Sequence, residues 1–181
     1  MNGMKRFLFV MRAWPVVAFV TIGLCYLTQL VAGWFGIDLP DQQNVEVVKR
    51  CLENAFASSR HFGIAAFLVA QVVVLMPILE ELAFRGLLFK GFCRVVRKIL
   101  PSDHPAIWSF DCSLAFISSA LFSAAHYIQQ PWPDSAFLAL FFFGVAQCWI
   151  YRKTERIWCA MLNHGLFNLT NLVLLFVLES A

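Results

Sequence analysis

Long apolar stretches alternate with short polar connections along the chain, and this pattern predicts an all-α fold. Each apolar stretch is near the roughly 20 residues that a helix needs to cross a bilayer. The five stretches cover about residues 7–35, 63–92, 109–128, 135–151 and 157–178. We therefore expect a polytopic membrane helix bundle with about five transmembrane helices.

The connection between the first two stretches, residues 37–61, is the one long polar segment of the chain. Apolar residues recur in it at helical spacing, with charged residues between them: Val45, Val48, Leu52 and Phe56. This spacing predicts an amphipathic helix that lies at the membrane surface and connects the first two spans. Asp38 or Asp41 is expected to cap the helix, with Pro40 near its start.

Composition supports a membrane protein, because 60% of the 181 residues are hydrophobic and only 14% are charged. A soluble domain carries about a quarter charged residues. A single integral-membrane domain over residues 1–181 is expected, with the lipid bilayer as its surroundings. Nucleic acid is not an expected partner, because no basic run is interleaved with aromatic residues.

Positive charge concentrates in alternate connections between the predicted spans. Ten of the 14 basic residues lie near the start of the first span, near the connection between the second and third spans, and between the fourth and fifth: Lys5, Arg6, Arg12, Lys90, Arg94, Arg97, Lys98, Arg152, Lys153 and Arg156. Cytoplasmic loops carry such an excess of lysine and arginine. The charge pattern therefore predicts a multi-pass protein of the cell membrane with a cytoplasmic N-terminus and an external C-terminus.

Polar residues inside the predicted spans are the candidate functional residues. A charge at the centre of a membrane helix costs on the order of 2.5–3.5 kcal/mol on insertion scales, so it is usually paired, faces a cavity or serves function. The candidates are Glu80, Glu81, Arg85, His126, Asn163, His164 and Asn168, with Asp111 and Gln147 as weaker ones near helix ends.

The second span carries two adjacent carboxylates that helix geometry separates. Glu81 and Arg85 are four residues apart, so they share a face and are expected to pair. Glu80 is turned by about 100° from Glu81 and remains without this partner. Pro77 lies one turn earlier and removes a backbone hydrogen bond, which is expected to kink the helix.

Two further pairs have the same spacing of four residues. His164 and Asn168 place two polar side chains on one face of the fifth span. In the third span the ring of Phe122 is expected to pack against His126 and to restrict its orientation.

These residues form three motifs that resemble those of the CPBP family of intramembrane proteases, also called the CAAX protease and bacteriocin-processing or Abi family. The motifs are E-E-x-x-x-R from Glu80 to Arg85, F-x-x-x-H from Phe122 to His126, and H-x-x-x-N from His164 to Asn168. They occur in order on separate apolar stretches. The resemblance covers roughly residues 63–175, the expected catalytic core, and leaves out the first span and the amphipathic connector.

The resemblance implies an intramembrane glutamic-type endopeptidase that hydrolyses a peptide bond of a membrane-anchored peptide or protein. Of the two site carboxylates, Glu80 would be the general base that activates a water with the help of His126. His164 and Asn168 would form the oxyanion hole, and Arg85 and Phe122 would orient their neighbours. No cofactor or metal is implied, and no covalent intermediate forms.

Other chemistries use the same residue types. Two histidines and a carboxylate can hold zinc, which leaves a metal-dependent membrane protease as an alternative, although no H-E-x-x-H motif is present. A serine protease is not favoured, because Ser123 has no G-x-S-x-G context and is expected to bond back to its own helix. A non-proteolytic membrane binding or immunity protein of the same family is a further alternative.

Overall fold

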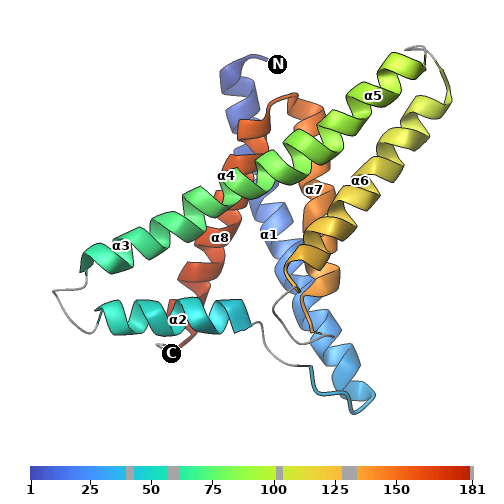
Figure 1. The fold of residues 1–181 in the computed structure, drawn as a ribbon. Helices are drawn as coiled ribbons and strands as arrows, with labels where there is room; N and C mark the ends of the chain where they lie inside the picture. Colours follow the sequence, from blue (N-terminus) through green and yellow to red (C-terminus); the bar gives the residue numbers. More distant parts are fainter. Residues whose placement is uncertain (40–42, 57–61, 101–103, 128–133, 180–181) are drawn as a thin grey trace.

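The computed structural model describes residues 1–39, 43–56, 62–100, 104–127 and 134–179, and all regular structure in these ranges is helical (Figure 1). The predicted all-α fold is therefore confirmed. Within the described part of the chain, four helices are long and apolar enough to cross a membrane: Gly3–Trp34, Gly63–Ile99, Ala106–Ala125 and Ile157–Val177.

The four helices correspond to predicted spans one, two, three and five. Helix α1 (Gly3–Trp34) is the first, α6 (Ala106–Ala125) the third, and α8 (Ile157–Glu179) the fifth. The predicted fourth span is helix α7 (Phe137–Thr154), which packs against α1, α6 and α8. Its last turn carries Arg152 and Lys153, which lowers its apolar character. A multi-pass membrane protein follows from the four helices, while a fifth crossing by α7 stays a prediction.

The second span is one long helix built from five consecutive segments. These are α3 (Phe62–Ala70), η2 (Gln71–Leu75), α4 (Met76–Glu81), η3 (Leu82–Lys90) and α5 (Gly91–Ile99). Segments η2 and η3 are π-helical, with wider turns than an α-helix. The helix continues through Pro77. The local irregularity expected at this proline is the π-helical segment η2, which ends two residues before it.

The amphipathic connector contains helix α2 (Gln43–Phe56), in agreement with the predicted helix. Its buried Leu52 packs with Ala65 of α3 and Leu172 of α8. Figure 1 shows α2 at the same end of the bundle as the C-terminus. The suggested capping residue Asp41 and the neighbouring Pro40 lie outside the described residues.

Helix α1 is an integral part of the bundle. Its buried residues Val10, Ala13, Val17 and Ala18 belong to one apolar core with residues of α6, α7 and α8. Polar contacts add to this packing: Arg6 Nε donates to the Thr154 carbonyl at 2.9 Å, and Trp14 Nε1 donates to Thr170 Oγ1 at 3.1 Å.

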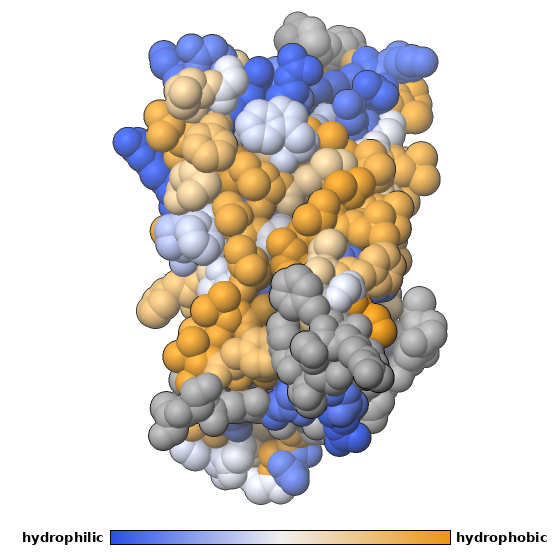
Figure 2. All heavy atoms as spheres, turned by 90° about the vertical axis from the view of Figure 1, so that its left-hand side faces the viewer, coloured by the Kyte–Doolittle hydropathy of each residue, from blue (hydrophilic) through white to orange (hydrophobic). Residues whose placement is uncertain are grey.

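The N-terminus, the end of α5, the start of α6 and the α7–α8 connection lie at one end of the bundle, so the three groups of basic residues lie near this end (Figure 1). Figure 2 shows a broad apolar belt between hydrophilic residues at the two ends. This arrangement fits a protein that spans a bilayer, and which end faces the cytoplasm stays a prediction.

Asp111 joins three helices at the basic end. It is almost fully buried near the start of α6 and accepts from Arg97 of α5 at 2.9 Å. The second arginine, Arg152 of α7, lies 3.2 Å away. One buried carboxylate thus holds the ends of α5, α6 and α7 together.

We expect Asp111→Asn to lower the free energy of unfolding by about 1.5–3 kcal/mol, because hydrogen bonds to charged groups contribute about this much. Thermal and denaturant unfolding in detergent micelles measure the loss. The matched control is Asp38→Asn, which makes the same change at an exposed carboxylate and is expected to leave stability unchanged. Equal stability of the two variants would contradict the role of Asp111.

Candidate active site

The predicted pair of Glu81 and Arg85 is present and completely buried. Arg85 Nη1 lies 3.2 Å from Glu81 Oε1, and both side chains have 0% exposure. The guanidinium has two further contacts: Nη2 donates to the Gly144 carbonyl of α7 at 3.1 Å, and the group lies over the Phe122 ring at 4.5 Å from the centroid. Arg85 is thereby enclosed by its own helix, α6 and α7.

Close packing of small residues makes the Gly144 carbonyl accessible to Arg85. A Cβ atom at Gly144 would lie only 2.9 Å from Ser119 Cβ, so α6 and α7 approach more closely than larger residues allow. One residue earlier on α6, Ser118 Oγ donates to the Phe84 carbonyl at 2.9 Å. Sequence reasoning did not select Gly144 or Ser118, and the signal it missed was the run of small residues on α6 opposite a glycine.

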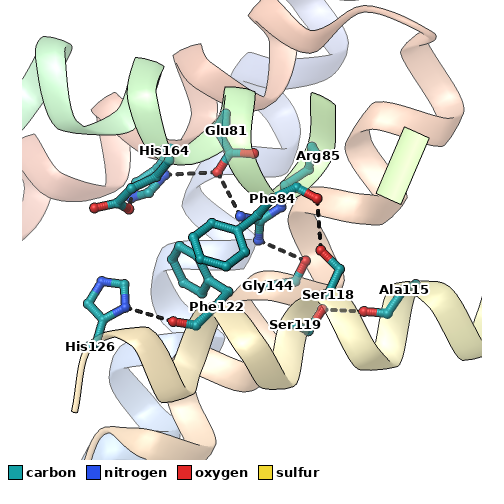
Figure 3. A network of polar contacts seen from close by, with 11 residues as sticks. Glu81, Phe84, Arg85, Ala115, Ser118, Ser119, Phe122, His126, Gly144 and His164 are labelled. Carbon is teal, nitrogen blue, oxygen red and sulfur yellow. Dashed lines mark hydrogen bonds and ion pairs between the residues drawn. The ribbon is translucent and has the colours of Figure 1, made fainter. Parts of the chain in front are cut away.

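His164 of helix α8 contacts both glutamates. Its Nδ1 lies 2.9 Å from Glu81 Oε1, and its Nε2 lies 3.6 Å from Glu80 Oε2. Because a carboxylate only accepts, Nδ1 carries a proton in this contact. Figure 3 shows Glu81 between His164 on one side and Arg85 on the other.

Glu80 differs from Glu81 in both exposure and partners. Its side chain is 20% exposed, whereas that of Glu81 is 0% exposed. Glu80 Oε2 makes no hydrogen bond and has His164 as its ionic neighbour. The positions of the two carboxylates around the helix axis thus differ as predicted, with Glu81 fully buried and Glu80 partly exposed.

His126 lies at the C-terminal cap of α6 and not inside the helix. The expected contact with Phe122 is confirmed, with ring centroids 4.7 Å apart. The His126 Nδ1 atom is 2.9 Å from the Phe122 carbonyl. The same Phe122 ring meets His164 edge-on at 5.9 Å, so both imidazoles lie against one aromatic ring (Figure 3).

Asn168 and Ser123 each donate a hydrogen bond to a backbone carbonyl of another helix. Asn168 Nδ2 donates to the Val72 carbonyl in η2 at 2.9 Å. Ser123 Oγ donates to the Phe137 carbonyl of α7 at 2.7 Å, so the expectation that it bonds back to its own helix was wrong. The reason is the close α6–α7 contact, which brings the Phe137 carbonyl of α7 within reach of the Ser123 hydroxyl.

Two buried amides lie outside this network. The side chains of Gln147 in α7 and Asn163 in α8 are fully buried, and neither amide has a hydrogen-bond partner among the described residues. Among the residues that the structure describes, no three His, Cys, Asp or Glu side chains form a group able to hold a metal ion.

An apolar cavity of about 380 Å³ opens beside α3 and α8. Its lining residues are Val69, Leu169, Leu172, Val173, Phe176 and Val177. Leu169 directly follows Asn168 in the sequence, so the cavity and the polar cluster occupy adjoining parts of α8.

We expect Arg85→Leu to lower the free energy of unfolding by about 3–5 kcal/mol, because it leaves the Glu81 charge buried without its cation. The double variant Glu81→Leu with Arg85→Leu is expected to recover most of this loss, since no uncompensated carboxylate remains there. Unfolding in mixed detergent micelles provides the comparison. A single variant as stable as the wild type would show that Arg85 does not stabilise Glu81.

Comparison with known proteins adds one match. Residues 62–170 fit a family model described as type II CAAX prenyl endopeptidase Rce1-like. No curated protein and no solved structure matches the chain. The matched part covers more than half of the chain and contains all three sequence motifs. The chain therefore belongs to the Rce1-like family of CAAX prenyl endopeptidases.

Proposed function

We propose that the chain is an intramembrane endopeptidase that hydrolyses a peptide bond of a membrane-anchored peptide or protein. The observation that carries this proposal is the unequal treatment of two adjacent carboxylates. Glu81 is buried against Arg85 and His164, whereas Glu80 remains partly exposed beside them. A carboxylate that water can reach, within a cluster of preset polar groups, suits a general base.

In the proposed reaction, Glu80 takes a proton from a water molecule, and the hydroxide attacks the carbonyl carbon of the scissile bond. A tetrahedral intermediate with a negatively charged oxygen forms. Glu80 then passes the proton to the leaving nitrogen, and the carbon–nitrogen bond breaks. The products are a carboxylic acid and an amine, and no covalent enzyme intermediate is needed.

His126 is proposed to help Glu80 hold the water. The Phe122 carbonyl can only accept, so Nδ1 of His126 carries the proton in their hydrogen bond. The neutral ring then has a free lone pair on Nε2, which can accept a hydrogen bond from a water. The shared contact of His126 and His164 with Phe122 supports their placement in one site.

His164 and Asn168 are proposed as the oxyanion donors. His164 uses Nδ1 to bind Glu81, so the ring must also carry a proton on Nε2 to donate to the oxyanion. Asn168 uses one N–H for Val72 and has a second one left for the substrate. Each preset donor is worth roughly 3–4 kcal/mol in a site that excludes water.

A membrane-anchored substrate follows from the surroundings of these groups. The polar cluster lies among helices that are apolar enough to span a bilayer, and the lining of the apolar cavity on α8 begins at Leu169, one residue after Asn168. An apolar segment of a substrate can therefore approach from the lipid and place a peptide bond at Glu80. The family description directs the first assay to prenylated CaaX peptides.

We expect Glu80→Gln to reduce cleavage by about 10²–10⁴-fold, the usual contribution of a general base. The assay uses purified protein in liposomes with a farnesylated CaaX peptide and the same peptide without the prenyl group. Glu53→Gln, which changes an exposed glutamate on α2, is the matched control and should cleave normally. Retained cleavage by a correctly folded Glu80→Gln protein would overturn the proposal and favour a non-proteolytic role.

We expect chelators to leave the cleavage rate unchanged, because the proposed water is activated by side chains alone. EDTA and phenanthroline are added to the same liposome assay, with a zinc protease as the positive control. Loss of cleavage that added Zn²⁺ restores would instead support the metal-dependent alternative.

A further inference from the structure

Backbone carbonyls in the π-helical turn before the glutamates lack their usual helical donors. Met76 N–H donates to the Gln71 carbonyl, five residues earlier, and is therefore directed away from Val72. The next residue, Pro77, has no N–H to offer. Neither the α-helical nor the π-helical donor is thus available to the Val72 carbonyl, and Val73 loses its α-helical donor for the same reason.

Helix α8 packs on these two carbonyls. Asn168 Nδ2 donates to the Val72 carbonyl at 2.9 Å. Gly165, three residues earlier on the same face of α8, is so close that a Cβ atom there would lie 2.5 Å from the Val73 carbonyl oxygen. His164 directly precedes this glycine, so the packing distance of α8 also sets the position of its imidazole.

A similar contact lies on the other side of the glutamates. The Phe84 carbonyl in η3 accepts a hydrogen bond from Ser118 Oγ of α6 at 2.9 Å. Both π-helical segments that flank Glu80 and Glu81 thus have a backbone carbonyl bound by a side chain of another helix. The α8 contact differs in that a missing proline N–H creates the need for it.

We propose that Gly165 and Asn168 are positioning residues that hold α8 against the π-helical turn before Pro77. Their contacts keep His164 Nδ1 on Glu81 and its Nε2 beside Glu80. Asn168 thereby replaces the backbone donor that Pro77 lacks, in addition to the oxyanion role proposed above. This inference rests on the proposed function for its catalytic consequence, but not for the contact itself.

A double-mutant cycle between Pro77→Ala and Asn168→Ala tests the contact through unfolding temperature, without any proteolysis assay. In the wild-type background, Asn168→Ala is expected to lower the unfolding temperature by about 2–4 °C or more. In the Pro77→Ala background the loss should fall to less than half, because residue 77 then supplies an N–H. Equal losses in the two backgrounds would overturn the proposed link between Asn168 and Pro77.

Gly165→Ala tests the position of His164, with Gly23→Ala as the control at a helical glycine that has nothing within 4 Å of an added Cβ. The readout is the downfield proton NMR signal of the His164 Nδ1–H bound to Glu81, assigned with a His164→Gln variant. Gly165→Ala should shift or abolish this signal, and Gly23→Ala should keep it. An unchanged signal in Gly165→Ala would refute the positioning role, whatever the cleavage assay gives.

The catalytic consequence is measured separately in the liposome assay. Gly165→Ala is expected to lower kcat by at least about tenfold with little change in KM, because misplacement by about 1 Å can cost up to 10²-fold in rate. A change confined to KM would contradict an effect through His164. If Glu80→Gln retains cleavage, the proposed function fails, while the unfolding and NMR results still decide the contact.

Discussion

The buried ion pair of Glu81 and Arg85 is the constraint on which the rest of the bundle depends. Two fully buried charges need partners in addition to each other, and each further partner of this pair comes from a different helix. Gly144 supplies a carbonyl from α7, Phe122 a ring from α6, and His164 an imidazole from α8. The contacts of this one ion pair thus join α6, α7 and α8 to the long helix.

This constraint also gives adjacent residues different chemical properties. Glu81 is enclosed between Arg85 and His164, while Glu80 lies at the edge of the same cluster with one oxygen free of hydrogen bonds. The side chains themselves cannot explain this difference in burial, because both residues are glutamates. Their position around the helix axis decides which one is fully buried and which one is partly exposed.

Contacts within one helix could be predicted from the sequence, whereas contacts between helices could not. The spacing of four residues predicted the pairing of Glu81 with Arg85 and the packing of Phe122 on His126, since helix geometry alone fixes both. The contact of His164 with Glu81 and that of Ser123 with Phe137 depend on helix packing distances, which small residues such as Gly165 and Gly144 set. Hydropathy located the helices, but π-helical turns leave no hydropathy signal.

The turn at η2 also changes which way the two halves of the long helix face. A π-helical turn accommodates one residue more than an α-helical turn, and one residue corresponds to about 100° of rotation. Helix α3 can therefore direct Ala65 towards α2 while α4, further along, directs its glutamates towards α8. In evolutionary terms the turn behaves like a single-residue insertion. Deleting one residue of 71–75 would remove this π-helical turn and rotate the glutamates by about 100° relative to α3.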